Sequence, residues 1–245
     1  MNQYALTYPQ LMGEIARCGF ESRELTLLRR AYDMAEKMTD GLYRPSGASF
    51  LSHLIRTASI TGRFAPTAPM MAAALLHASY SLGRLGWIGT RITRRAPRRL
   101  LRRAVGSEVE RLVFGYDALV WDSPQAIRNH LQKLDGGSTL ERSILLLRLA
   151  NQLEDHLDGA LAFMAAGAAH RQLLCAEACP DLALGLGHDE LAEELEAALA
   201  GGRRCKPPAA LKLDREFAYG VRTKNLPELA GLRRSLRAAV RRRRR

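Results

Sequence analysis

The stretch Leu75–Tyr80, which reads Leu-Leu-His-Ala-Ser-Tyr, decides the fold expected for this chain. It ends an apolar run that begins at Met70, and an uninterrupted run of this kind predicts a buried helix. His77 stands at the end of that run, and a second histidine, His53, lies on the preceding predicted helix. A third predicted helix passes through Asn151 and can bring an amide to the same point. Three buried helices that each contribute one polar side chain at one depth can form a metal or phosphate site.

The composition indicates a helical protein. The chain has 245 residues, enough for one large domain or one domain with an appendage. Of these residues 47% are hydrophobic and only 6% aromatic, and the core they can form consists mainly of alanine, leucine, valine and isoleucine. Alanine and leucine favour helices, and no segment alternates as a strand does. We therefore predict an all-α fold.

The net charge of +12 suggests an anionic ligand or partner. Much of this charge lies in two segments, Arg91–Arg103 and Arg233–Arg245. The four cysteines show no zinc-type pairing, and Cys175 and Cys179 fit two core thiols four residues apart on a helix. No signal peptide is apparent and charged residues interrupt every apolar run, so we expect a cytoplasmic protein without a transmembrane segment.

Capping and turn signals divide the chain further. Ser138 is a cap for a long helix expected to reach about Ala166, and Ser107 with Glu110 fits a capping box after a break at Gly106. Two more helices are expected in residues 168–201. We predict a helical domain over residues 1–200, a linker at 201–208 and a basic helical extension at 209–245.

Four segments resemble, in order, parts of the HD-superfamily hydrolases of the stringent-response (RelA/SpoT) type. The first is Arg44-Pro-Ser-Gly followed by His53, and the second is Ala73–His77. The third is Val105–Val113, and the fourth is Arg142–Leu153, which contains Leu-Ala-Asn-Gln-Leu where the family has Leu-Ala-Asp-Arg-Leu. The resemblance implies an HD-like helical bundle.

In that family two histidines and two aspartates hold a divalent ion, typically manganese, and a Glu-Asp pair activates the attacking water. Carried over by position, His53 and His77 are retained, but the aspartate after the second histidine is Ala78. The third-helix aspartate is Asn151, and no carboxylate lies between Ala78 and Leu82. We therefore expect hydrolysis of the guanosine alarmone to be absent or very slow.

A metal site remains an open interpretation. His53, His77 and Asn151 provide two imidazoles and an amide, which should bind manganese weakly and suit zinc better; iron is a further candidate. Asp155 shares a helix face with Asn151, so an acid can re-enter the site one turn later. The alternative is that Glu154 and Asp155 are surface charges near a helix end.

An anionic ligand pocket is the second interpretation. Arg44 resembles an arginine that touches the nucleotide in the family, and Ser79 and Tyr80 adjoin the second histidine. Arg44 can equally be a solvated turn residue, and Tyr80 an ordinary core residue. The candidate pocket for a phosphorylated or nucleotide-like molecule comprises Arg44, His53, His77, Ser79, Tyr80 and Asn151.

Three functions follow. One is a pseudoenzyme that binds an anionic small molecule, and another is a metal-dependent HD-type phosphohydrolase with a rewired site. The third is binding of nucleic acid, an anionic membrane surface or an acidic partner through arginine-rich segments, for which solvated charge is the alternative. The arginines concerned are Arg98, Arg99, Arg102 and Arg103, with Arg233, Arg234, Arg237 and Arg241 in the tail.

Overall fold

The computed structural model describes residues 4–44, 46–81, 95–163, 166–204 and 208. These residues are helical, with turns and loops between the helices and a single isolated β-bridge that pairs Tyr43 with Ser49. The predicted all-α fold class is confirmed. The basic extension and the arginines Arg233, Arg234, Arg237 and Arg241 lie outside the described residues.

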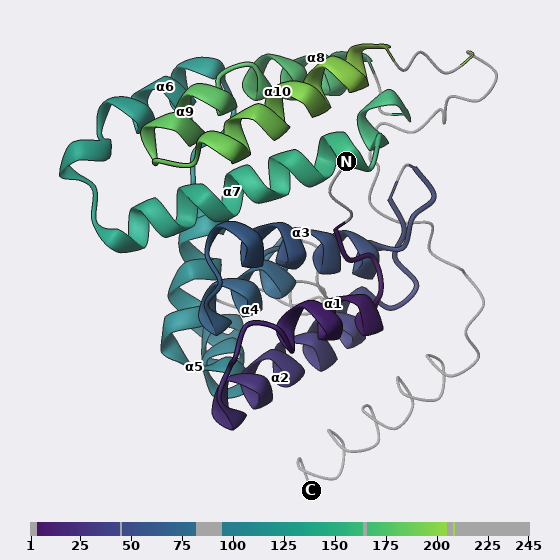
Figure 1. Ribbon diagram of the computed structural model, residues 1–245, viewed down its shortest axis with the longest axis vertical. Helices are drawn as coiled ribbons and strands as arrows, with labels where there is room; N and C mark the ends of the chain where they lie inside the picture. The colour runs from purple at the N-terminus through teal and green to yellow at the C-terminus, as the bar shows by residue number, and fades with distance from the viewer. Residues whose placement is uncertain (1–3, 45, 82–94, 164–165, 205–207, 209–245) are drawn as a thin grey trace, which may run out of the picture.

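The helices fall into two groups on either side of α7 (Thr139–Leu157), which crosses the molecule (Figure 1). One group contains α1 (Tyr8–Ile15), α2 (Ser22–Thr39), α3 (Phe50–Phe64), α4 (Ala68–Leu76) and α5 (Arg95–Ala118). The other contains α6 (Pro124–Gln132), α8 (Ala166–Ala176), α9 (Cys179–Gly185) and α10 (Asp189–Arg204), with short 3-10 turns at Leu134–Gly136 and Ala160–Phe163.

Serine side chains cap the starts of α3, α6 and α7, and the cap at Ser138 is one that the sequence predicts. Ser49 accepts a hydrogen bond from the backbone N–H of Ser52 and so starts α3. Ser123 starts α6 in the same way, and Ser138 caps α7 with a capping box completed by Glu141. Each cap pairs backbone groups that the first helical turn leaves without an internal partner.

The helices after α7 differ from the expectation. α7 ends at Leu157 instead of about Ala166, because Gly159 adopts a φ of 69° and turns the chain. Between residues 166 and 204 the structure has three helices, where two were expected in residues 168–201. α10 continues to Arg204, into the beginning of the segment predicted to be a linker.

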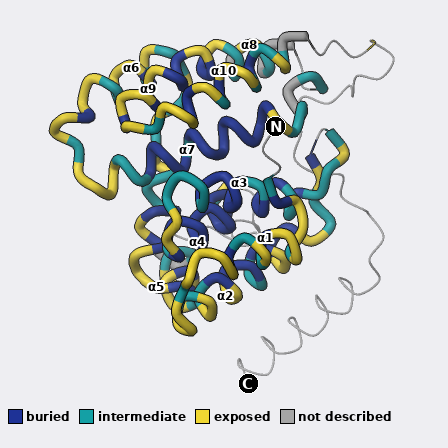
Figure 2. Tube along the Cα trace, viewed as in Figure 1, coloured by how far each residue is buried: buried dark blue, intermediate teal, exposed yellow. Residues whose placement is uncertain are grey.

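α4 is the most enclosed helix of the first group. All of its residues except Pro69 are buried, as the dark trace in Figure 2 shows. It packs against α2, α3, α5 and α7, so polar side chains have no place along its length. The first polar residue after this apolar helix is its C-cap, His77. His77 therefore lies at the end of α4 inside the protein.

α5 bends at Gly106, where φ is 88°, as the predicted helix break requires. The predicted capping role of Glu110 is not what the structure shows. Its carboxylate accepts hydrogen bonds from Arg98 and Arg102 on the preceding half of the helix. The side chain thus joins the two halves of α5 across the bend.

Among the described residues no helix is long and apolar enough to cross a membrane.

Candidate functional site

The side chains of His53 and His77 meet where α3, α4 and α7 converge. Their Nε2 atoms are 3.3 Å apart, and the residues are only 3% and 4% exposed. His53 lies in the first turn of α3 and His77 ends α4, so two rigid helices fix the pair. The structure brings together the two histidines that the sequence singled out.

The outer nitrogens of both rings are already engaged. Nδ1 of His77 donates to the carbonyl oxygen of Ala74 at 2.7 Å, so a neutral His77 keeps its lone pair on Nε2. Nδ1 of His53 makes a short contact with the carboxyl group of Glu154. A histidine that binds a metal through one nitrogen usually gives its other N–H to a carbonyl or carboxylate, and both histidines have this arrangement.

Asn151 adds an amide to the site from α7. Its Nδ2 donates to Oδ2 of Asp155 at 3.3 Å, which fixes the amide orientation. Its Oδ1 is buried and has no hydrogen-bond partner among the described residues. A buried carbonyl oxygen without a partner is costly unless a donor or a cation binds it, so this atom is a potential ligand.

The acids on α7 are buried, so the interpretation of Glu154 and Asp155 as surface charges is wrong. Glu154 is 1% exposed and Asp155 8%. The sequence could not show this, because the charge that compensates them comes from Arg44, more than a hundred residues earlier. The Arg44 guanidinium pairs with Asp155 at 2.6 Å and with Asp158 at 3.2 Å.

Arg44 is fully occupied by these internal contacts. Its Nη2 donates to Asp155, its Nε to Asp158, and its Nη1 lies 3.0 Å from Nδ1 of His53. Arg44 is therefore not a solvated turn residue. In this conformation its guanidinium binds acids of the protein itself and is not directed at an external anion.

Burial sets the protonation states of this cluster. Burial lowers the pKa of His53 to about 3, with Arg44 as the next cause, and it lowers that of His77 to about 3 as well. Both rings are thus neutral at pH 7. Burial also raises the pKa of Glu154 well above its ordinary value. The pKa of Asp155, which burial alone would raise, is lowered by the Arg44 guanidinium.

Ser79 and Tyr80 do not join the histidine pair. The Ser79 hydroxyl donates to the carbonyl oxygen of Leu76, and the Tyr80 hydroxyl donates to Glu110 at 3.2 Å. Tyr80 belongs instead to a second cluster, which we call the Glu110 cluster. Its members are Tyr80, Arg98, Arg102 and Glu110.

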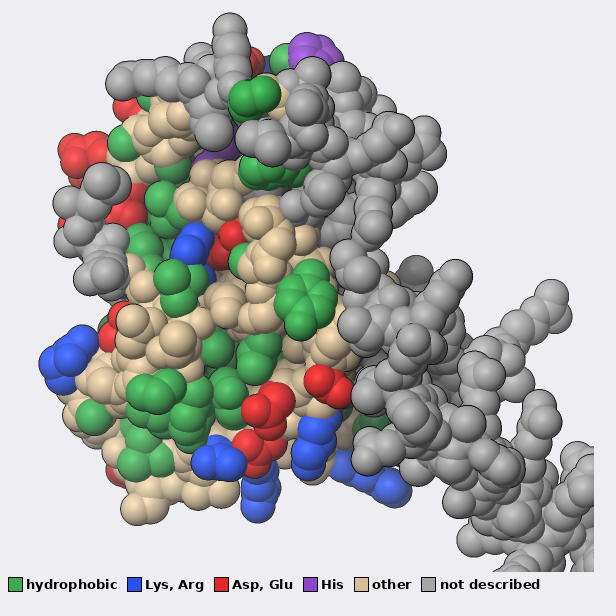
Figure 3. All heavy atoms as spheres, turned by 90° about the vertical axis from the view of Figure 1, so that its right-hand side faces the viewer, with side chains coloured by type: hydrophobic (Ala, Val, Ile, Leu, Met, Phe, Trp, Pro, Cys, Tyr) green, Lys and Arg blue, Asp and Glu red, His purple; other side chains and the backbone are tan. Residues whose placement is uncertain are grey.

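On the predicted anion-binding face of α5, two arginines are therefore paired with an acid and two are exposed. Arg98 and Arg102 pair with Glu110, and the Arg98 guanidinium lies 3.7 Å from the centre of the Phe114 ring. Arg99 and Arg103 are exposed. On the face turned away from α5, which Figure 3 shows, acidic and basic side chains lie next to one another at the lower end.

Two further residues beside the histidines were missed from the sequence. Arg148 donates to the Tyr116 hydroxyl at 2.6 Å, and the Tyr116 ring packs edge-on against His77 at 4.9 Å. The Nε of Arg148 is buried and has no hydrogen-bond partner among the described residues. The sequence did contain a sign of Arg148, because this residue precedes Asn151 by one helical turn and so lies on the same side of α7.

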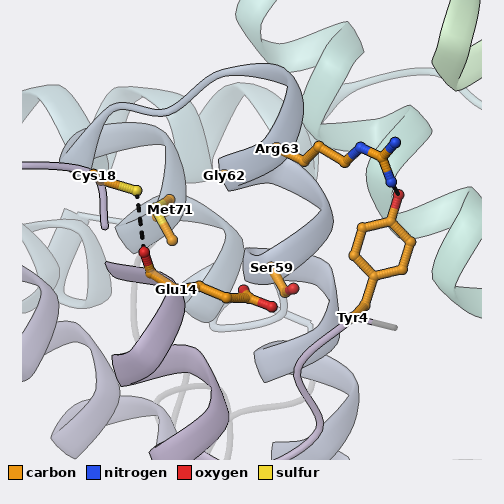
Figure 4. Close-up of a pocket in the computed structure, with 7 residues that line it drawn as sticks. All are labelled: Tyr4, Glu14, Cys18, Ser59, Gly62, Arg63 and Met71. Carbon is orange, nitrogen blue, oxygen red and sulfur yellow. Dashed lines mark hydrogen bonds between the residues drawn. The ribbon is translucent and has the colours of Figure 1, made fainter. Parts of the chain in front are cut away.

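A cavity of about 260 Å³ lies elsewhere, between α1, α3, α4 and the segment before α1 (Figure 4). Arg63 reaches the Tyr4 hydroxyl at one end, and at the other the Cys18 thiol donates to the carbonyl oxygen of Glu14. Arg63 also pairs with Glu190 and with Glu194, so it is neutralised. None of the predicted site residues lines this cavity.

Comparisons with known proteins give partial matches. The family described as a domain of unknown function, DUF6817, matches residues 34–120, a range that includes both histidines and ends before α7. The search of curated proteins finds no match. Among solved structures the chain is similar to a metazoan ortholog of SpoT that hydrolyses ppGpp. The TM-score is 0.48 and the identity 16%, over 74% of this chain and 96% of that chain.

Proposed function

We propose that this chain is a metal-binding domain of the HD type, in which His53, His77 and Asn151 hold one divalent transition-metal ion. We further propose that it does not hydrolyse the guanosine alarmone by the route of the RelA/SpoT hydrolases. The observation that carries the proposal is the pair of Nε2 atoms 3.3 Å apart, each on a ring whose Nδ1 is engaged elsewhere.

The two histidine nitrogens fit a metal ion in spacing, and all three atoms fit one in chemistry. Two ligands at zinc–nitrogen distances around a tetrahedral ion lie about 3.3 Å apart, which is the separation of the two nitrogens. Two imidazole lone pairs that face each other repel unless a proton or a metal ion lies between them. The buried Oδ1 of Asn151 supplies a third ligand atom.

The donor set favours zinc or ferrous iron over manganese. Imidazole nitrogen suits zinc and iron, whereas manganese prefers sites rich in carboxylate oxygen. The two rings need no deprotonation at neutral pH, because burial lowers the pKa of each to about 3. The acid beside Asn151 is Asp155, which orients the amide and is paired with Arg44.

A bound ion of this kind lowers the pKa of a bound water and polarises a phosphoryl oxygen. The chain's own groups then decide which reaction can follow. In the tautomer that would bind a metal ion through Nε2, His53 carries its proton on Nδ1 and donates it to Glu154. No carboxylate follows His77, where the resembling family has its Glu-Asp pair, and the Ser79 hydroxyl is hydrogen-bonded to Leu76. A general base for alarmone hydrolysis is therefore missing there.

A second candidate function is binding of an anionic, phosphorylated or nucleotide-like molecule beside this ion. The observation that favours it is the buried Nε of Arg148, a charged donor without a partner among the described residues, one turn from Asn151. Arg148 would take the role that the sequence gave to Arg44. A rewired phosphohydrolase that uses the same ion is the enzymatic form of this candidate.

Metal analysis of protein purified without a chelator tests the main proposal. We expect near one zinc or iron ion per chain in the wild type and close to none in His77→Gln. His130→Gln is the matched control, since the His130 ring lies on α6, in the other group of helices, and contacts the carbonyl oxygen of Val120 and the Trp121 ring. In the same preparation, alarmone with manganese should release no pyrophosphate above a blank. Absence of metal from the wild-type protein would refute the proposal. Rapid release of pyrophosphate that His77→Ala abolishes would refute it as well.

A further inference from the structure

Arg44 lies in a place that suits a metal cation. The residue is 7% exposed, and its guanidinium is surrounded by acids from the end of α7. Asp155 is 2.6 Å away, Asp158 3.2 Å and Glu154 3.9 Å. Acids that surround one point in the interior repel one another when ionised unless a positive charge lies among them.

The groups around Arg44 form a cation site by themselves. His53, Glu154 and Asp155 each offer one ligand atom, and these atoms lie within 4.8 Å of one another. The carboxylate of Asp158 and the hydroxyl of Ser46, hydrogen-bonded to each other at 2.8 Å, adjoin the group. Carboxylate and hydroxyl oxygens are the ligands that hard divalent ions prefer.

This position is separate from the proposed metal position on the other edge of the His53 ring. Nε2 of His53 faces His77, whereas Nδ1 faces Glu154 and the Arg44 guanidinium. One imidazole thus stands between two places for a cation. The first is rich in nitrogen and the second is rich in oxygen.

We propose that Arg44 is a built-in cation that fills this second position, so that the chain holds one metal ion where its side chains could hold two. Arg44 is then a positioning residue. It neutralises the acids, and through Asp155 it fixes the amide of Asn151. Arginine suits this role because its guanidinium keeps its charge at every accessible pH and donates in several directions at once.

On this proposal the carboxylates of α7 bind no metal ion in the wild type. Each has a donor already: Asp155 and Asp158 bind Arg44, and Glu154 binds His53. A second ion would have to displace the guanidinium from all of them. The number of ions bound is therefore set by one side chain from the loop before α3.

Calcium is a selective probe, because it binds oxygen ligands and has little affinity for imidazole. Arg44→Gln removes the guanidinium charge and leaves the acids in place. We expect full-length Arg44→Gln to bind one Ca²⁺ by isothermal titration calorimetry, and the wild type to bind none. Saturating Ca²⁺ should raise the Tm of this variant by about 5 °C or more over its value in chelator, and leave the wild-type Tm unchanged.

Arg63→Gln is the matched control, since Arg63 also pairs with two carboxylates but at the surface. It should lose stability without gaining Ca²⁺ binding. The inference rests on the proposed function only for the first ion. The double variant with His77→Gln should still bind Ca²⁺, so failure of the histidine site and failure of this inference give different results.

Two outcomes would overturn the inference. One is an Arg44→Gln protein that is folded by circular dichroism and binds no Ca²⁺. The other is an Arg44→Gln protein that is as unfolded in Ca²⁺ as in chelator, because the loop would then need the shape and hydrogen bonds of the guanidinium instead of its charge.

Discussion

Glu110 and Glu154 are both buried glutamates, but their surroundings give them opposite properties. Glu110 pairs with Arg98 and Arg102, whose side chains are 30% and 52% exposed. Burial alone would raise its pKa, and the hydrogen bonds from these arginines lower it below its ordinary value. Glu154 lies beside His53 with 1% of its side chain exposed, and there burial raises its pKa.

The difference lies in where the partners of each acid come from. The partners of Glu110 are near it in sequence and reach it from the surface, so the carboxylate stays ionised and joins the two halves of α5. The partners of Glu154 come from the loop before α3 and from α3 itself, and they hold it beside a buried histidine. The following predictions test this contrast between the Glu110 cluster and the histidine cluster, which comprises Arg44, His53, His77, Asn151, Glu154 and Asp155.

The largest expected effect is on stability. Asp155→Ala should lower the free energy of unfolding by about 3–5 kcal/mol, because it leaves Arg44 buried with only part of its counter-charge. Glu110→Gln should cost less, about 1–2 kcal/mol, since water screens the arginines that it leaves behind. Urea unfolding of both variants measures this. Equal losses would show that the two clusters do not differ as described.

The next effect is on metal affinity. Glu154→Gln should weaken metal binding by about 10–100-fold, because the amide accepts the proton of His53 Nδ1 less well than a carboxylate does. Glu110→Gln should leave the affinity unchanged, since Glu110 makes no contact with the histidines. Competition with a chromophoric chelator gives both values. A comparable loss in the two variants would assign Glu154 a purely structural role.

The two clusters should also respond to different ranges of pH. In the folded protein the pKa of His77 is about 3, below its ordinary 6.5, so its contribution is present above pH 6.5 and is lost as the pH falls toward 3. In metal-free protein, His77→Gln should reduce the slope of unfolding free energy against pH by up to about 1.4 kcal/mol per unit between pH 6 and 4.

Glu110 provides the contrasting pH profile. Its pKa is lowered from 4.5, so its contribution is present above that pH and disappears only as the pH falls further. Glu110→Gln should therefore change the slope only in the acid part of the same titration. A change at pH 6 in Glu110→Gln, or no change there in His77→Gln, would contradict the assignments.

The smallest expected effect concerns metal preference. Asn151→Asp replaces the neutral amide with a carboxylate, which gives a hard ion the charge that the site lacks. We expect manganese affinity to rise by about tenfold relative to zinc. Gln152→Glu is the control, because Gln152 is the next residue and hydrogen-bonds with His156 instead. Equal gains in the two variants would show that general charge, and not ligation, is responsible.

Much of the fold could be predicted because its signals are local. Helical spacing and the cap at Ser138 depend on residues a few positions apart, and so does the bend at Gly106. The meeting of His53 and His77 was expected from a resemblance and from the apolar run of α4, which leaves His77 buried at its end.

The partners and burial of Glu110 and Glu154 could not be predicted from the sequence. Their partners are either distant along the chain or replace the partner that a local pattern predicts. Glu110 occupies a capping-box position after Ser107, yet two arginines across the bend take its carboxylate. In the sequence Glu154 resembles a surface charge near a helix end, but in the structure Arg44, from the loop before α3, lies against it. Burial of a charge depends on tertiary contacts, and these are not encoded in spacing along one helix.

X-ray absorption of the zinc-loaded protein tests the central claim most directly. The account predicts two imidazole nitrogens at about 2.0–2.1 Å from the metal, with the remaining ligands oxygen. His77→Gln should lose one imidazole, and His130→Gln should retain both. A zinc environment that contains sulfur, or a spectrum with two imidazoles that His77→Gln leaves unchanged, would contradict a site built on His53 and His77.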